Sequence, residues 1–476
     1  MLTLEFTLDP ADIPRLTRWP GVRAARAFPL EITWHDTTGF DLANQNLALS
    51  QRARIWFLTP LDPRLSAIPE PPPAEARHPS LLGHTLPESL ELKAVFRGRR
   101  QSLRWTGPAG ETALLTLLQG RCIPGPDVCA VTLEGLTTTI GPLATTLAAS
   151  LGLHVPRASL TQRALAAAGH PPPLPTLGAP SLTADLPVNE SLAAIIGHLL
   201  GVMLQWADQI PGALTPGALT PEPVHQMRVA IRRLRSALSV FRPAAPCPEL
   251  TALSLPLRAC ATHLGAARDW DVFLESTAPH LTASLGETIS NDPRYPAMLR
   301  AAARRRRHIY AGLQAYLAGP EFRTLAAGLA CAVALRPWDD PANPATKQAT
   351  SLFAVATLSH RLRHVHKSGR HIERLPLPAL HELRKDCKRL RYAAEFFRPL
   401  LPAAHAKRYL ARLSDLQEEL GLLNDTTSIT GLMAQLGRPH TFAAGLVEGF
   451  AAAGARPART RIARRWKTFR QAKPFW

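Results

Sequence analysis

The residues best suited to chemistry are cations spaced along two related segments. Residues Val224–Pro243 read VHQMRVAIRRLRSALSVFRP, and residues Leu380–Pro399 read LHELRKDCKRLRYAAEFFRP. The two segments align without gaps at an offset of 156 residues, and nine of the twenty positions are identical. The same offset aligns Leu264–Val272 with Leu420–Ser428. The chain therefore contains an internal duplication.

Each copy predicts an amphipathic helix that carries two stripes of side chains. Apolar residues recur at alternating steps of three and four, which forms a seam facing a core. One position further round, a second stripe with the same spacing is cationic. It consists of His225, Arg228, Arg232 and Arg235 in the first copy and of His381, Arg384, Lys388 and Arg391 in the second. A helical rise of about 1.5 Å per residue spreads the first stripe over roughly 15 Å, enough to face several consecutive phosphates.

A stripe of like charges needs a partner outside its own helix. Such pairs cost roughly 0.2–0.5 kcal/mol each, and the segment Val224–Pro243 contains no acidic residue to offset them. Arginine suits phosphate because its planar guanidinium donates paired hydrogen bonds, and histidine adds a further donor. The alternative is a solvated helix face on which arginine stems cover apolar surface. That alternative does not explain two copies of the same pattern.

The positive charge of the chain lies almost entirely in its second part. The 476 residues have a net charge of +19; basic side chains exceed acidic ones by two in residues 1–184 and by seventeen in residues 185–476. This excess favours inorganic polyphosphate, nucleic acid or an acidic membrane surface, without choosing among them. The six cysteines have neither metal-ligand nor disulfide spacing. With no recognisable signal peptide or membrane-length apolar run, we expect a cytoplasmic protein.

Short strands between Pro and Gly clusters predict an antiparallel sheet or barrel over residues 1–168. The predicted strands are Leu2–Leu8, Glu31–His35, Arg54–Leu58, Leu90–Phe96, Gln101–Trp105, Thr112–Leu118 and Val128–Leu133, and the predicted helices are Gly141–Leu153 and Ser159–Ala168. A Pro-rich linker covers residues 169–187. Residues 188–470 have helical periodicity throughout, so the chain is predicted to be a multidomain α+β protein.

The repeated helix resembles the CHAD family, the conserved histidine α-helical domain. The resemblance rests on the V-H-x-M-R-x-x-x-R-R-L-R run, its partner L-H-x-L-R-K-x-x-K-R-L-R-Y, and the L-G-x-x-R-D-x-D-V segment at Leu264–Val272. It implies two pseudo-symmetric four-helix bundles, with a first repeat at about 188–336 and a second at about 345–470, whose motif helices line a basic groove. The implied partner is inorganic polyphosphate, bound without catalysis or cofactor.

The same resemblance sets expectations for other partners. Phosphate or sulfate ions would mimic the ligand, and the protein would associate with polyphosphate granules. We expect no membrane partner, and nucleic acid is the alternative polyanion.

The motif matches also define the predicted polyphosphate-binding residues. These are His225, Arg228, Arg232, Arg233 and Arg235 in the first copy and His381, Arg384, Lys385, Lys388, Arg389 and Arg391 in the second. Arg268 matches the third element, and its counterpart is Asn424, which predicts an asymmetric site. Arg361 and Lys367 are predicted as further groove cations. Glu395 is expected to pair with Arg391 instead of contacting ligand.

Residues 1–168 resemble a degenerate CYTH domain, a β-tunnel triphosphatase fold. The Glu-x-Glu-x-Lys signature of that family corresponds here to Thr3, Glu5 and Thr7, and a later strand that alternates Glu keeps only Glu134. Triphosphatase chemistry needs carboxylates that hold a divalent metal. Mg²⁺ or Mn²⁺ is therefore expected only if the domain is active, with Glu5, Asp36 and Glu134 as candidate ligands. A non-catalytic tunnel or scaffold is the expectation, and a metal-dependent inorganic triphosphatase is the alternative.

Overall fold

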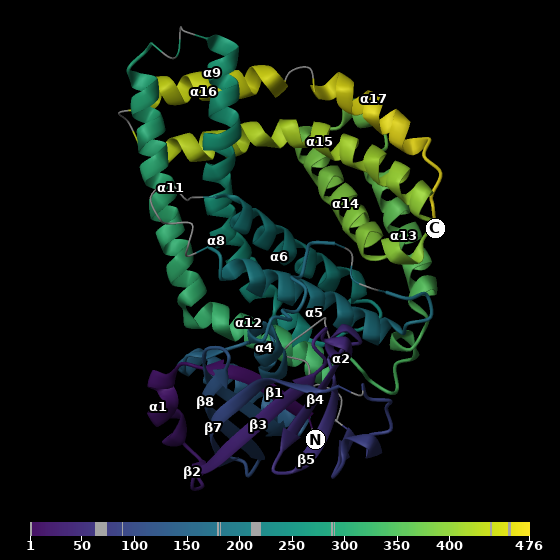
Figure 1. The fold of residues 1–476 in the computed structure, drawn as a ribbon. Helices are drawn as coiled ribbons and strands as arrows, with labels where there is room; N and C mark the ends of the chain where they lie inside the picture. The colour runs from purple at the N-terminus through teal and green to yellow at the C-terminus, as the bar shows by residue number, and fades with distance from the viewer. Residues whose placement is uncertain are drawn as a thin grey trace. The chain divides into compact units, whose positions relative to one another are not determined.

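Alternating apolar residues in the first part of the chain form an antiparallel sheet (Figure 1). Among the described residues the sheet has ten strands. They are β1 (Leu2–Leu8), β2 (Val22–Ala24), β3 (Phe28–Asp36), β4 (Leu47–Arg52), β5 (Ile55–Pro60), β6 (Ala74–Ala76), β7 (Glu91–Thr106), β8 (Thr112–Ile123), β9 (Asp127–Gly135) and β10 (Leu153–His154). Every strand predicted from the sequence lies within one of these strands, except for one residue at the edges of β5 and β7.

The computed structural model describes most of the chain, in two compact units. The described residues are 2–61, 74–87, 89–178, 180, 182–210, 220–286, 289, 291–437, 440–455 and 458–476, and within these the side chains of residues 2, 403, 422–428, 454, 455 and 458 are outside the description. The first unit consists of Met1–Thr176, Ile196–Gln205 and Tyr316–Pro337. The second consists of Leu177–Ile195, Trp206–Ala315 and Trp338–Trp476.

The predicted antiparallel sheet of the first unit is present, and it is not closed, so the words barrel and tunnel describe it only loosely. Its strand order is β10-β1-β9-β8-β7-β3-β4-β5-β6, with β2 paired to β7, and the two outer strands β10 and β6 do not pair in the described part of the chain. The two strands predicted at Leu90–Phe96 and Gln101–Trp105 form one long strand, β7, which continues through Gly98. A side chain there would clash with the facing strand, because a Cβ on Gly98 would lie 2.1 Å from the carbonyl oxygen of Gln119.

Both faces of the sheet are covered by apolar packing. On one face Leu4, Phe6 and Leu8 are buried, and helices α3 (Thr137–Ser150) and α12 (Pro320–Leu335) pack there against β9 and β1. On the other face α4 (Leu160–Ala167) packs against a second core cluster. That cluster contains Ile32, Trp34, Ala94, Phe96, Cys122, Leu160, Ala164 and Leu165. The face that would line a tunnel is therefore partly filled by apolar side chains.

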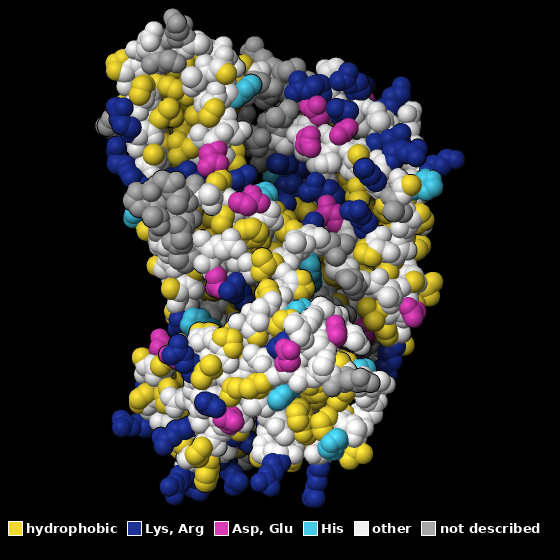
Figure 2. Space-filling view, viewed as in Figure 1, with side chains coloured by type: hydrophobic (Ala, Val, Ile, Leu, Met, Phe, Trp, Pro, Cys, Tyr) yellow, Lys and Arg dark blue, Asp and Glu magenta, His cyan; other side chains and the backbone are white. Residues whose placement is uncertain are grey.

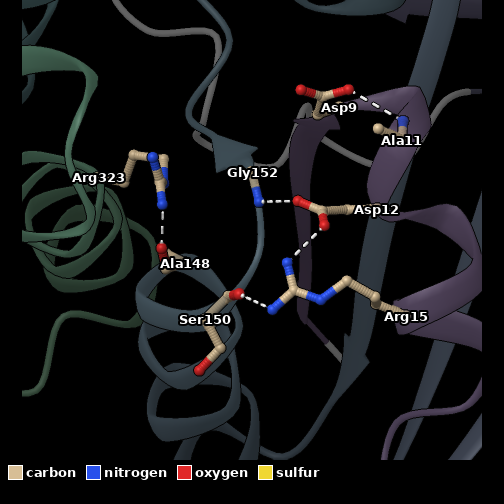
Figure 3. A network of polar contacts seen from close by, with 8 residues as sticks. All are labelled: Asp9, Ala11, Asp12, Arg15, Ala148, Ser150, Gly152 and Arg323. Atoms are coloured by element: carbon tan, nitrogen blue, oxygen red, sulfur yellow. Dashed lines mark hydrogen bonds and ion pairs between the residues drawn. The ribbon is translucent and has the colours of Figure 1, made fainter.

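A network of hydrogen bonds connects the segment before β10, at the edge of this sheet, to helix α1 (Ile13–Thr17), which precedes β2 (Figure 3). Asp12 accepts a hydrogen bond from the backbone N–H of Gly152 at 2.6 Å and one from Arg15 at 2.6 Å. Arg15 also donates to the carbonyl oxygen of Ser150 at 2.7 Å. The Gly152 N–H is the main cause of a lowered pKa at Asp12. The carboxylate therefore stabilises the turn before β10.

The predicted seams become the buried faces of two helices in the second unit. In α6 (Glu222–Phe241) and α14 (Leu377–Phe396), the seam residues Val224, Met227, Ile231, Leu234, Leu380, Leu383, Cys387 and Leu390 are all buried. The other helices of residues 188–470 are α5 (Val188–Ala207), α7 (Pro248–Ala252), α8 (Ser254–Val272), α9 (Ala278–Leu285), α11 (Arg294–Ala318), α12 given above, α13 (Thr350–Ser368), α15 (Ala403–Ala434), α16 (Thr441–Ala455) and α17 (Ala458–Arg470). The helical prediction for this region is confirmed.

The two copies of the repeat share a core within the second unit. Helix α6 packs on α8, α14 packs on α13 and α15, and α6 contacts α14. Phe241 and Phe397 are 156 residues apart and both buried, with ring centroids 6.0 Å from each other. Phe353 of α13 lies against both rings, at 5.0 and 5.9 Å. Burial of these aromatic side chains holds the duplicated helices together.

One described helix, α5, is long and apolar enough by length and composition to cross a membrane. The sequence prediction looked for an uninterrupted apolar run and found none, since Glu190 and His198 interrupt this segment. Its mean hydropathy is nevertheless high enough to meet the criterion for a membrane-spanning helix. Within the structure 72% of its apolar window is buried, as in the core helix of a globular protein.

Replacing Asp12 by Asn should lower the stability of the first unit at neutral pH. Loss of a charged acceptor from a largely buried hydrogen bond costs about 1.5–3 kcal/mol. Because the pKa of Asp12 is lowered in the folded chain, its stabilisation is present above the unfolded value near 3.8 and is lost as the pH falls further. Thermal unfolding of the full chain should separate wild type from variant at pH 7, and the difference should shrink as the pH falls below the unfolded value.

The matched control is Asp127→Asn, which removes a carboxylate that is 91% exposed and 3.9 Å from Arg121. An exposed pair of this kind contributes little. Equal destabilisation by both substitutions would contradict the role given to Asp12.

Candidate functional site

A cavity of about 710 Å³ lies where α6 and α14 meet, bordered also by α7 and the start of α8. We call it the α6–α14 cavity. Its cationic lining residues are Arg232, Arg235, Arg242, Arg258, Lys385, Lys388 and Arg389, and none of the residues that line it is Asp or Glu. Figure 2 shows Lys and Arg side chains gathered in a hollow of the helical part. The cavity is therefore a strongly electropositive pocket.

The cavity brings together predicted residues from both copies of the repeat. Arg232 and Arg235 come from α6, and Lys385, Lys388 and Arg389 come from α14. Two lining cations, Arg242 and Arg258, were not predicted. Arg242 lies seven residues, two helical turns, beyond Arg235, so an extension of the stripe would have found it. Arg258 belongs to α8 and had no signal in the repeat, since Ser414 stands 156 residues later.

The two predicted stripes share one electrostatic environment. Burial, together with the charges of Arg384, Arg232, Arg391 and Arg228, lowers the pKa of Lys388 to about 8. Burial also lowers the pKa of Arg232. The stripe residues are therefore close enough for each charge to act on its neighbours across the contact between α6 and α14.

The electrostatic environment of His225 includes a charge from another helix, α8. Burial, together with the charge of Arg268 on α8, lowers the pKa of His225. Arg268 is thus close enough to the α6 stripe for its charge to act on His225. The side chain of its counterpart Asn424 lies outside the described residues, so the asymmetry predicted there stays a prediction.

Several polar atoms around the contact of α6 and α14 are buried without a hydrogen-bond partner in the described protein. They are Nε of Arg232, Arg233, Arg384 and Arg391, Oγ of Ser236 and the hydroxyl oxygen of Tyr392. Each unsatisfied buried group costs about 1–3 kcal/mol, so native proteins normally satisfy such groups. Of these residues, Arg232, Ser236 and Tyr392 line the cavity. A ligand rich in acceptor oxygens, bound in the cavity, would offer hydrogen-bond acceptors to these three residues.

A glycine holds the second arginine of each stripe in the same way. A Cβ on Gly265 of α8 would lie 2.7 Å from Nη1 of Arg228. A Cβ on Gly421 of α15 would lie 3.1 Å from Nη2 of Arg384. Both the glycines and the arginines are separated by 156 residues. The duplication therefore preserves a close approach of arginine to helix backbone, which a larger residue would disturb.

The predicted pair between Glu395 and Arg391 is present, at 3.4 Å. Glu395 also accepts a hydrogen bond from Arg233 at 2.9 Å, and Arg233 donates in addition to the carbonyl oxygen of Leu177. Arg233 and Arg391 are therefore held by a carboxylate of the chain itself, and neither lines the α6–α14 cavity.

The remaining predicted cations lie outside the cavity lining. His381 is exposed on α14, and Lys367 is exposed in the last turn of α13. Arg361 of α13 lies near Arg389, and burial together with that neighbouring charge lowers its pKa. Asp386, which is buried, accepts hydrogen bonds from Arg389 at 2.9 Å and from Ser368 at 2.7 Å. Asp386 thus fixes Arg389, a cavity residue, against α13.

In the first unit, two of the three candidate metal ligands hold the fold. Glu5 accepts hydrogen bonds from the N–H of Leu160 and from Arg163, both at 3.1 Å, at the start of α4. Asp36 is buried and accepts the backbone N–H groups of Thr37, Leu42 and Ala43, at 2.8, 3.0 and 3.0 Å. In the described ranges no three His, Cys, Asp or Glu residues form a group that could hold a metal.

The third candidate, Glu134, shares a sheet face with Glu5. Glu134 pairs with Thr3, and Glu5 pairs with Thr132, so all four side chains project from the same side of β1 and β9. Because Glu5 is already engaged by α4, metal-dependent triphosphatase activity stays a hypothesis.

Comparison with known proteins agrees with the architecture of the helical part. The family model described as CHAD domain matches residues 198–434. The crystal structure of the CHAD domain from the plant Ricinus communis is similar at 30% identity and a TM-score of 0.52, over 64% of this chain and 99% of that one. PptA from Streptomyces chartreusis is similar at 16% identity and a TM-score of 0.43, over 59% of this chain and 100% of that one. No curated protein matches the chain. The two copies of the His/Arg helix, the all-helical unit that holds them and the match to the plant domain show that the chain belongs to the CHAD family.

Proposed function

We propose that the helical part of the chain binds inorganic polyphosphate in the α6–α14 cavity. The observation that supports this most strongly is the set of seven cationic side chains around one cavity, whose described lining residues include no Asp or Glu. A linear polyanion with closely spaced charges can neutralise several of these cations at once. Binding of this kind would bring the protein to polyphosphate granules.

The lining offers two kinds of donor to phosphate oxygens. Arginine guanidinium groups such as those of Arg235 and Arg242 can each donate paired hydrogen bonds to one phosphate. The hydroxyl groups of Ser236 and Tyr392, which are buried and have no hydrogen-bond partner among the described residues, can donate one bond each. Lys388 supplies a compact charge that turns with its flexible stem. The role proposed for this set of donors is binding.

The cavity suits polyphosphate better than nucleic acid, the alternative partner. Single-stranded nucleic acids bind by stacking their bases on aromatic side chains. Tyr392 is the aromatic residue among those that line the cavity. It is buried, and its ring is approached by the guanidinium groups of Arg232 at 5.1 Å and Arg391 at 5.4 Å. Its ring is therefore already used in cation–π contacts within the protein.

Replacing Arg235 and Lys388 by Ala should weaken binding of long-chain polyphosphate by about 100-fold. A hydrogen bond to a charged group contributes about 1.5–3 kcal/mol, and each 1.4 kcal/mol is a factor of ten in affinity. Filter binding at fixed ionic strength measures the effect. The matched control replaces Arg304 and Arg307 of α11, which are both exposed and outside the cavity lining, and should change affinity less than threefold. Equal losses in the two variants would refute the cavity as the binding site.

Competition decides between the two polyanions. Bound polyphosphate is challenged with single-stranded DNA or RNA at matched phosphate concentration and matched salt, because polyanion affinity depends steeply on salt. We expect at least tenfold weaker competition by either nucleic acid than by unlabelled polyphosphate. More effective competition by nucleic acid would identify that polymer as the ligand.

The affinity for polyphosphate should fall as the pH rises from 7 to 9. The lowered pKa of Lys388, about 8, makes this amine neutral in the free protein above pH 8, whereas a bound polyanion favours its charged form. Binding is then coupled to proton uptake, and one such group changes the affinity by about tenfold between pH 7 and pH 9.

The control for this pH dependence is Lys388→Arg, which stays charged across the whole range and should show a flatter pH profile. Titration calorimetry in buffers of different ionisation enthalpy measures the proton uptake directly. An unchanged pH profile in Lys388→Arg would exclude Lys388 as the group responsible.

A further inference from the structure

The two sides of the contact between α6 and α14 are not equivalent, although the helices are copies of each other. On the side that forms the cavity, α6 contributes Arg235, Ser239 and Arg242. The residues 156 positions later are Arg391, Glu395 and Arg398. We call the surface that carries Arg391, Glu395 and Arg398 the second side of the contact. It has a carboxylate, Glu395, at the position where the cavity side has the small hydroxyl group of Ser239.

Glu395 is held between cations of both helices. Its Oε2 lies 2.9 Å from Nη2 of Arg233 on α6, and its Oε1 lies 3.4 Å from Nε of Arg391 on α14. The three side chains are only 25%, 17% and 23% exposed, in that order. The carboxylate also acts on Arg232, whose pKa it raises against the opposing effect of burial.

Because Glu395 contacts Nη2 of Arg233 and lies near Nε of Arg391, an external phosphate would compete with this carboxylate for both side chains. Displacement would leave a largely buried negative charge without its partners, next to an incoming anion of the same sign, and both effects oppose binding. On the cavity side no carboxylate lines the equivalent space. Ser239 and Glu395 are thus one residue pair in which the two sides differ in charge, and Arg258 with its counterpart Ser414 is another.

We propose that Glu395 acts as a built-in anion that closes the second side of the contact, so that polyphosphate occupies the cavity side alone. This inference rests on the proposed function, because it defines how much of the duplicated basic surface the ligand contacts. Glu395 is a specificity-determining residue in this sense. It limits the number of phosphates that one protein molecule engages.

The experiment measures affinity for long-chain polyphosphate over a range of NaCl concentrations in the full chain. Glu395→Ser installs the residue of the first copy, and Glu395→Gln removes the charge while keeping the side-chain size. Both should bind about tenfold more tightly at low salt. The slope of log affinity against log salt should steepen by about one to two, since additional phosphates then release counterions.

The matched control is Asp415→Ser, which causes the same change in net charge. Asp415 of α15 pairs with Arg465 of α17 at 3.1 Å, with 44% and 41% of the two side chains exposed. It should change affinity less than twofold. Equal tightening in Asp415→Ser and Glu395→Ser would overturn the proposal, because net charge alone would then explain the result. Unchanged or weaker binding in folded Glu395→Gln would also overturn it.

A reciprocal pair of variants tests the equivalence of the two sides. Ser239→Glu places a carboxylate in the cavity and should weaken binding at least tenfold, and adding Glu395→Ser should restore most of the loss by opening the other side. No restoration in the double variant would overturn the inference. Absence of polyphosphate binding by the wild-type chain would instead refute the proposed function, so the two failures are distinguishable.

Discussion

Keeping like charges side by side is the constraint on which the helical unit depends. Arg232 of α6 and Lys388 of α14 occupy equivalent positions in the two copies. Burial, together with the charges of neighbouring arginines that include Arg232, lowers the pKa of Lys388, which shows the cost of that arrangement. The electrostatic repulsion is opposed by the favourable free energy of burying the apolar residues directly behind the cations. The seams of both helices are buried, and Phe241, Phe353 and Phe397 form a shared aromatic contact. The hydrophobic effect thus holds together a surface that electrostatics alone would push apart.

Local periodicity made the two motif helices predictable. The alternation of steps of three and four placed Met227 and Leu383 in the core and the cations one position away, and the structure shows that pattern. The cavity itself was not predictable, because it depends on which helix turns meet after folding. Arg258 enters it from α8, and the buried Asp386 that fixes Arg389 stands where the first copy has Ala230. Neither residue has a counterpart of the same type, so the repeat gave no sign of them.

The first unit shows the limits of a strand pattern. Each strand was predicted from its own alternation, yet whether a sheet closes depends on pairing between its first and last strands in space, which no local pattern specifies. The surroundings of the acidic residues were unpredictable for a related reason. Glu5 was considered as a metal ligand from its strand position, whereas α4, 155 residues further along the chain, supplies the N–H and guanidinium that it accepts. The hydrogen-bond partners of a carboxylate such as Glu5 can thus lie far away in the sequence.

The asymmetry between Ser239 and Glu395 has a consequence for how such a protein can evolve. In a symmetric homodimer one codon specifies the residue on both subunits, so every substitution appears twice, once on each side of the twofold axis. Here the two motif helices belong to one polypeptide and are encoded separately. A negative charge could be added on one side without adding it on the other. An internal duplication therefore permits one copy to carry a carboxylate that the other lacks, as Glu395 and Ser239 do, a difference that a dimer of identical chains cannot have.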